Sequence, residues 1–181
     1  MRAFIALEPP DEFVDDVAAV ARRLAPYVEG RFVPPENYHL TLAFLGDITE
    51  SQAEAAMDAV EEACAGQPPI TLEPHGLGCF GRGRAATLWL GFSTTPQLEE
   101  LADRTRRALT ARGLAFDGKP FRPHLTLARA ARLPQGPLPD LPFPAQTEAR
   151  LVTLLKSTLH KEGATYKPLY SVELAGWGQP R

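Results

Sequence analysis

Hydrophobic and polar residues follow two different periods along this chain, which together predict interleaved strands and helices. Apolar residues recur every three or four positions at 11–25, 53–64 and 98–112, as on the buried face of an amphipathic helix. Apolar or alternating runs predict strands at 3–7, 38–45, 70–73, 77–80, 85–92, 121–129, 149–159 and 166–174. The proline-rich stretch 131–146 has no clear period and is predicted to be a connecting loop. Strands and helices mixed in this order indicate the α+β class.

One tetrad within this pattern occurs twice. Residues 39–42 read His-Leu-Thr-Leu, and the same four residues return at 124–127. Alternate side chains of a strand face opposite ways, so each tetrad presents its His and Thr on one face and buries its two leucines behind them. Similar elements surround both copies, which indicates a rough internal duplication of about half the chain. We therefore predict two similar lobes that face each other across a groove, within one domain spanning residues 1–181.

The bulk composition is ordinary for a globular protein, with 44% apolar and 23% charged residues. No apolar run approaches the roughly 18 residues that a membrane-spanning helix needs, so no membrane partner is expected. Cys64 and Cys79 are too few to build a disulfide scaffold, and reduced thiols favour a cytoplasmic location.

The net charge of −3 argues weakly against a broad nucleic-acid-binding surface, but it is compatible with a small basic site. Basic residues that cluster in sequence around the candidate site are Arg82, Arg84, Lys119, Arg122 and Arg129. The alternative is that each of them is a solvated surface charge.

Metal binding and nucleophilic catalysis both fit the tetrads poorly. His75 and His160 stand in no metal-ligand spacing with the tetrads, and the chain has no HExxH or Cys-x-x-Cys motif. Threonine is a poor zinc ligand, and two copies would supply two nucleophiles where acyl transfer needs one. The chain also lacks a Gly-x-Ser-x-Gly turn and a phosphate-binding loop. We therefore expect no metal and no cofactor.

Acid–base chemistry on a phosphodiester ring suits the pair better. Imidazole titrates near pH 6.5, so one histidine can take a proton from attacking water while the other protonates the departing oxygen. The hydroxyls of Thr41 and Thr126 can donate to the non-bridging oxygens, and a nearby arginine can stabilise their charge. Arg129 would face away from Thr126 on an ideal strand, so this role requires that the strand ends or bulges there.

At these residues the chain resembles the two-histidine (2H) phosphoesterase superfamily, which is defined by two His-x-Thr/Ser-x motifs. The resemblance is strongest to the bacterial and archaeal RNA 2′,3′-cyclic phosphodiesterases, once called 2′-5′ RNA ligases. It rests on Arg2–Leu7, on Glu36–Gly46, on Phe121–Arg129 and on Ser157, Gly163 and Tyr166, which follow in the expected order.

The resemblance implies a bilobal α+β fold with an antiparallel sheet in each lobe and a central groove. It further implies metal-independent hydrolysis of a terminal 2′,3′-cyclic phosphate on RNA to a 2′-phosphate, with 2′-5′ ligation as the secondary reverse reaction. Carried over residue by residue, His39 would be the general acid and His124 the general base. Thr41, Thr126 and Arg129 would bind the phosphate.

The substrate beyond the phosphate is less constrained by the sequence. Phe80, Arg82, Arg84, Lys119 and Arg122 are candidates for RNA binding, with Phe80 either stacking on a base or filling a sheet edge. The expected partner is RNA with a 2′,3′-cyclic end, tRNA fragments among the candidates, bound by a monomer. The alternatives are the same chemistry on a small cyclic nucleotide, and a nucleotide-binding or RNA-binding module without catalysis.

Overall fold

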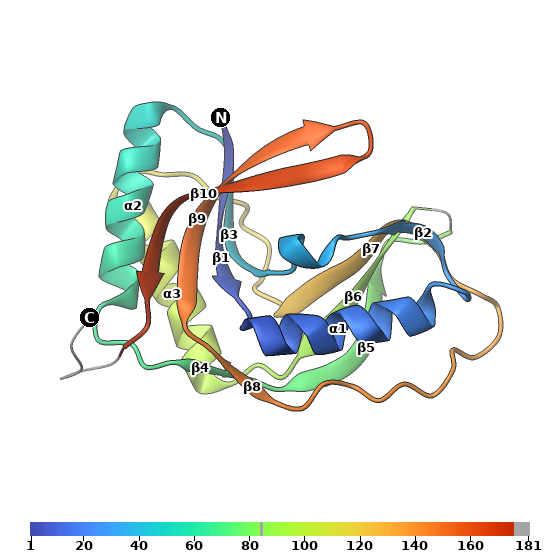
Figure 1. The fold of residues 1–181 in the computed structure, drawn as a ribbon. Helices are drawn as coiled ribbons and strands as arrows, with labels where there is room; N and C mark the ends of the chain where they lie inside the picture. The colour runs from blue at the N-terminus through green and yellow to red at the C-terminus, as the bar shows by residue number, and fades with distance from the viewer. Residues whose placement is uncertain (84, 176–181) are drawn as a thin grey trace.

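The elements follow the predicted interleaved order in a computed structural model that describes residues 1–83 and 85–175. The described residues form three α-helices, one short 3-10 helix (η1) and ten strands (Figure 1). In chain order they are β1 (Arg2–Glu8), α1 (Asp11–Leu24), β2 (Glu29–Phe32), η1 (Pro35–Asn37), β3 (Leu40–Asp47), α2 (Glu50–Cys64), β4 (Ile70–Leu72), β5 (Pro74–Phe80), β6 (Ala86–Phe92), α3 (Pro96–Ala111), β7 (His124–Arg132), β8 (Thr147–Ala149), β9 (Leu151–His160) and β10 (Gly163–Glu173).

The described strands form three sheets, and every pairing between them is antiparallel. The first sheet has the order β10-β9-β1-β3 and the second β2-β7-β6-β5, while β4 pairs with β8 alone. The first tetrad leads into β3 and the second opens β7, so each large sheet carries one motif. The predicted α+β class, with an antiparallel sheet in each lobe, is confirmed.

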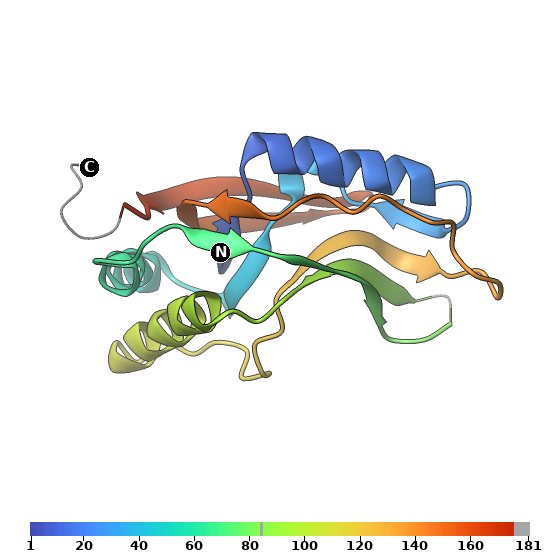
Figure 2. The same cartoon turned by 90° about the horizontal axis from the view of Figure 1, so that it is seen from below.

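The helices exchange partners between the two lobes. Helix α1 directly follows β1 of the first sheet, but its Phe13 packs against Phe92 of β6 in the second sheet, with ring centroids 6.0 Å apart. Helix α3 follows β6, yet Arg106 of α3 donates from Nε to the carbonyl of Leu42 in β3 at 3.2 Å. Figure 2 shows α1 on one side of the molecule and the α2–α3 pair on the other. This exchange binds the two lobes to each other.

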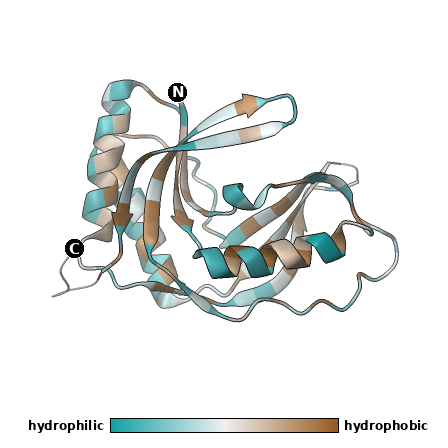
Figure 3. Ribbon diagram, in the orientation of Figure 1, coloured by the Kyte–Doolittle hydropathy of each residue, from teal (hydrophilic) through white to brown (hydrophobic). Residues whose placement is uncertain are grey.

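Burial behind the tetrads follows the expected alternation. Leu40, Leu42, Leu125 and Leu127 are all fully buried, and all four belong to one hydrophobic cluster that runs through both lobes. In Figure 3 the far end of the β9–β10 hairpin is mainly hydrophilic to neutral, and the outward faces of the helices are hydrophilic as well. The core therefore holds the tetrads from behind, and the hairpin end projects beyond it.

The helices begin close to their predicted starts, whereas two short strands were not predicted. Thr49 forms a capping box with Gln52 and Thr95 caps α3 ahead of Pro96, so α2 and α3 begin two or three residues before the ranges expected from their apolar spacing. Strands β2 and β8, which the sequence did not predict, are short and mostly polar. Strand β7 begins three residues later than predicted, because Pro123 precedes it and proline cannot donate to a ladder. It also extends three residues beyond its predicted end, to Arg132. No described helix is both long and apolar enough to cross a membrane.

Candidate active site

His39 is fixed by hydrogen bonds at both ring nitrogens. Its Nδ1 lies 2.7 Å from the carbonyl oxygen of Asn37, at the end of η1, and its Nε2 lies 3.0 Å from Oγ1 of Thr41. A carbonyl only accepts, so Nδ1 carries a proton and Nε2 of the neutral ring accepts from the Thr41 hydroxyl. The nitrogen available for proton transfer is therefore Nε2, beside the threonine.

His124 repeats this anchoring in the other lobe. Its Nδ1 lies 2.7 Å from the carbonyl oxygen of Arg122, two residues earlier, as Asn37 is two residues before His39. Its Nε2 is thus also the free proton-transfer atom. The half-buried Thr126 follows on the same strand face, although no hydrogen bond joins it to His124. Both lobes fix the same tautomer by the same local device.

Aromatic rings flank both imidazoles. The His39 ring centroid lies 4.8 Å from that of Phe4 and 5.4 Å from that of Tyr166. The His124 centroid lies 5.0 Å from that of Phe80, edge to face, and 6.0 Å from that of Trp89. These ring contacts restrict the rotation of each imidazole.

A bulge in β7 turns Arg129 towards the site. Trp89 pairs with Thr126 but the preceding Leu88 pairs with Ala128, so β7 has one residue more than β6 between these pairs. Leu127 and Ala128 are consequently both buried, and Arg129 falls on the same face as Thr126. The sequence required a bulge or a strand end for Arg129 to face the phosphate, and the bulge is present.

The bulge is duplicated in β3. Ile5 pairs with Ala43 and the next residue, Ala6, pairs with Thr41, so Leu42 is the extra residue. Phe44 therefore occupies in β3 the place that Arg129 occupies in β7. The guanidinium of Arg2 lies over the Phe44 ring at 4.5 Å. Each lobe thus brings an arginine close to its motif, the first from the neighbouring strand β1 and the second from the motif strand itself.

Burial and nearby positive charge favour the neutral form of both histidines. Burial, together with the charges of Arg129 and His124, lowers the pKa of His39 to about 4, although the hydrogen bond to the Asn37 carbonyl opposes this shift. Burial also lowers the pKa of His124, assisted by Arg129 and Arg122 and opposed by the Arg122 carbonyl. The positive charge of Arg129 thus lowers the pKa of both rings. An anion bound beside Arg129 would raise both pKa values.

A groove of about 370 Å³ opens on the His39 side of the site. It is lined by the first motif, by three arginines and by the β9–β10 hairpin, namely by Arg2, Phe4, Arg31, His39, Thr41, Phe44, Arg129, Ser157, Leu159, His160, Gly163, Ala164 and Tyr166. His124 and Thr126 do not line it. Arg31 was missed in the sequence, because the short polar strand β2 that carries it has no recognisable pattern.

The other RNA-binding candidates are dispersed. Phe80 and Arg122 lie beside His124, and the Arg122 guanidinium is 5.6 Å from the Phe80 ring centroid. Lys119 is exposed and ion-paired with Asp117 at 3.6 Å, away from the groove lining. Arg82 is exposed in the turn after β5, and Arg84 lies outside the described residues. Phe80 therefore contacts a candidate catalytic residue as well as its sheet neighbour Trp89.

The donor set at the site suits proton transfer and anion binding. Two imidazoles, two hydroxyls and guanidinium groups offer neither carboxylates nor thiolates, which most protein metal sites include. Among residues 1–83 and 85–175, no group of three or more His, Cys, Asp or Glu side chains is arranged to hold a metal ion.

Comparison with known proteins gives consistent relatives. A family profile described as "LigT like Phosphoesterase" matches residues 7–89 and 92–166. The RNA 2′,3′-cyclic phosphodiesterase of Thermotoga maritima is 30% identical, with 97% of each chain covered. A crystal structure from Thermus thermophilus matches with a TM-score of 0.83 at 26% identity, covering 98% of this chain and 100% of that one. Escherichia coli LigT complexed with 3′-AMP gives a TM-score of 0.79 at 30% identity, covering 96% and 97%.

Proposed function

The chain belongs to the LigT-like phosphoesterase family, and on that premise we propose that it is an RNA 2′,3′-cyclic phosphodiesterase. The single observation that carries this proposal is the paired anchoring of His39 and His124. Each ring donates from Nδ1 to a backbone carbonyl and leaves Nε2 for proton transfer. The charge of Arg129 lowers the pKa of both rings. The RNA 2′,3′-cyclic phosphodiesterase of T. maritima and the nucleotide bound to E. coli LigT support the same substrate class.

The hydrolysis needs one proton taken and one given. His124 Nε2 accepts a proton from water as its oxygen bonds to phosphorus, and the bond from phosphorus to the 3′ oxygen breaks on the opposite side. His39 Nε2–H protonates that departing oxygen, which leaves a 2′-phosphomonoester and a free 3′-hydroxyl. His39 must be protonated before this step, and the bound phosphate anion beside Arg129 favours that form.

Charge that develops on the phosphate is stabilised by the surrounding donors. The Thr41 hydroxyl is released from His39 once Nε2 is protonated, because that nitrogen then has no lone pair to accept it. Thr41 and Thr126 can then donate to the non-bridging oxygens from opposite lobes. Arg129 supplies the positive charge. These groups need no metal ion, so the reaction is metal-independent.

The same geometry supports ligation when an RNA 5′-hydroxyl replaces water. The 5′ oxygen bonds to the phosphorus of the cyclic ester, the bond to the 3′ oxygen breaks, and a 2′-5′ linkage results. We expect this ligation to be secondary, because water is far more concentrated than RNA ends. The enzyme acts as a monomer in the cytoplasm on RNA 3′ ends, tRNA fragments among them, and Phe80, Arg122, Arg82, Arg84 and Lys119 contribute to RNA binding.

The test is incubation with RNA ending in a 2′,3′-cyclic phosphate, in the presence of a chelator, with the product identified. We expect conversion to a 2′-phosphate at an undiminished rate. A 3′-phosphate product would show that the 2′ oxygen departs instead of the 3′ oxygen. Loss of turnover in chelator would exclude the metal-independent mechanism. Turnover confined to mononucleotides would favour the small-nucleotide alternative, whereas binding without turnover would favour the non-catalytic module.

A further inference from the structure

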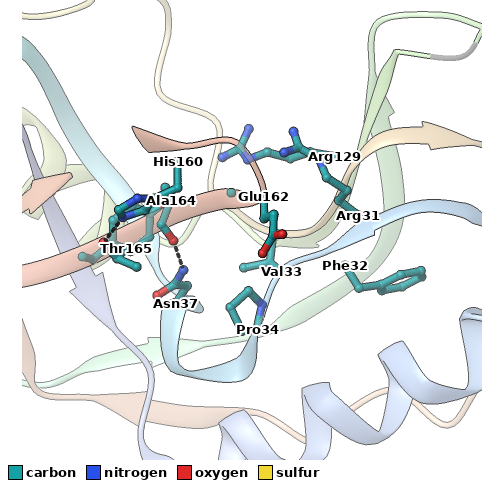
Figure 4. Close-up of a pocket in the computed structure, with 12 residues that line it drawn as sticks. Arg31, Phe32, Val33, Pro34, Asn37, Arg129, His160, Glu162, Ala164 and Thr165 are labelled. Atoms are coloured by element: carbon teal, nitrogen blue, oxygen red, sulfur yellow. Dashed lines mark hydrogen bonds between the residues drawn. The ribbon is translucent and has the colours of Figure 1, made fainter. Parts of the chain in front are cut away.

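A second cavity of about 440 Å³ continues from the groove beneath the β9–β10 hairpin (Figure 4). It shares Arg31, Arg129 and the hairpin residues with the groove and adds a floor from the segment between β2 and η1. Its lining consists of Arg31, Phe32, Val33, Pro34, Asn37, Arg129, His160, Glu162, Gly163, Ala164, Thr165 and Tyr166. The volume lies within the range of pockets that bind small molecules and cofactors.

Two arginines stand opposite each other at the boundary between the two cavities. Arg31 of β2 is the register partner of Arg129 of β7, and like charges placed directly opposite on antiparallel strands repel. Within the part of the chain that the structure describes, no ion pair is found for either guanidinium. In Figure 4 the carboxylate of Glu162, the cavity's acidic residue, points away from both. The pair is therefore arranged for an external anion.

The roof of this cavity is connected to the catalytic histidine through one residue. The Asn37 side chain donates from Nδ2 to the carbonyl of Ala164 on the hairpin at 2.9 Å, and the Asn37 backbone carbonyl accepts from Nδ1 of His39. The hairpin is thus held over the cavity by the same residue that orients His39. A molecule between the hairpin and the floor would lie adjacent to the reacting phosphate.

We propose that this cavity binds the nucleotide immediately upstream of the cyclic end, with Arg31 contacting the phosphodiester that joins it to the terminal nucleotide. The inference rests on the proposed function. Arg129 would hold the reacting phosphate and Arg31 the next phosphate along the chain, which relieves the repulsion between them. Phe32, Val33 and Pro34 supply an apolar floor against which a ribose or base can pack. The cavity therefore selects an RNA chain over a single nucleotide.

Binding to stable product analogues tests the site without turnover. The probes are a short RNA ending in a 2′-phosphate and a nucleoside 2′-phosphate without a 5′-phosphate. Arg31→Gln should weaken binding of the RNA by at least about fivefold more than binding of the nucleoside phosphate, and should reduce the salt dependence of RNA binding. Arg132→Gln is the matched control, since it removes the same charge from the same β2–β7 ladder outside both cavities and should leave both affinities within about twofold.

Three results would overturn the proposal. Equal loss of affinity for the two probes in Arg31→Gln would place Arg31 at the terminal phosphate only. No loss of affinity for either probe would leave the cavity without a role in RNA binding. Equal losses in Arg31→Gln and Arg132→Gln would indicate a diffuse charge effect. Selective loss for the RNA in a protein that hydrolyses no cyclic phosphate would support the subsite while contradicting the proposed enzyme activity.

Discussion

Identical residues acquire different properties in the two lobes. His39 hydrogen-bonds to Thr41 and its pKa falls to about 4, whereas His124 has no such bond to Thr126 and lies beside Arg122. Repetition of the tetrad made both His–Thr pairs predictable, because a strand places them on one face regardless of context. These differences were not predictable, since burial and hydrogen-bond geometry at each histidine depend on how the whole chain folds around it.

Burial of neutral His39 makes stability depend on pH. Its pKa is about 4 in the folded chain, against an ordinary value of 6.5 when the side chain is exposed, so between these values the unfolded chain binds more protons and stability falls as pH falls. From pH 8 to pH 5 we expect the wild-type free energy of unfolding to drop by about 2 kcal/mol more than that of His39→Gln. Urea unfolding at both pH values measures this, with His75→Gln at an exposed position as control. Parallel pH profiles for His39→Gln and wild type would show that His39 is not buried neutral.

At the scale of the element, two matched bulges decide which side chains face the groove. Leu42 and Leu127 are each the extra residue of their strand, so the face alternation reverses after each tetrad. Strict alternation along β7 would place Arg129 on the face opposite Thr126, whereas the extra residue Leu127 brings both onto the same face. Bulges depend on strand pairing, and pairing partners are not visible in a single sequence. The short strand β2, which supplies Arg31, escaped prediction because it is polar and is defined by its pairing with β7.

Strand β5 determines the position of His124 through a missing side chain. A Cβ on Gly78 would lie 2.1 Å from Cη2 of Trp89, and that indole packs against His124 and Phe80. Gly78→Ala should therefore displace Trp89, cost about 1–3 kcal/mol of stability by overpacking and lower kcat by about tenfold or more. Thermal unfolding and steady-state kinetics measure the two effects. Gly118→Ala, where a Cβ meets open space, should do neither. Unchanged kcat in Gly78→Ala would show that the indole does not position His124.

At the scale of the whole molecule, the two lobes share one core. The leucines behind both tetrads belong to one hydrophobic cluster, and α1 and α3 each pack on the sheet of the other lobe. The strand and helix periods and the repeated tetrad were enough to predict α+β lobes with antiparallel sheets that each carry one tetrad. The exchange of helices was not predictable, because helical spacing shows that a face is buried but not which sheet buries it.

This shared core favours a single folding unit over residues 1–181. We expect one cooperative thermal transition, with equal calorimetric and van't Hoff enthalpies. Differential scanning calorimetry combined with far-ultraviolet circular dichroism provides the comparison. Two resolved transitions would show that the lobes unfold separately, and the groove between them would then be a domain interface.

The division of labour between the histidines is tested most directly by changing the departing atom. Alanine at either position should lower turnover of a 2′,3′-cyclic phosphate by about 10²–10⁴-fold with the fold retained. In a cyclic substrate with sulfur at the 3′ position, the departing thiolate needs little protonation, because a thiol ionises near pH ~8.5. His39→Ala should then recover most of its lost rate relative to wild type, and His124→Ala should not. Recovery by His124→Ala alone would reverse the assignment, and near-wild-type activity of either variant on the oxygen substrate would contradict catalysis by the two histidines.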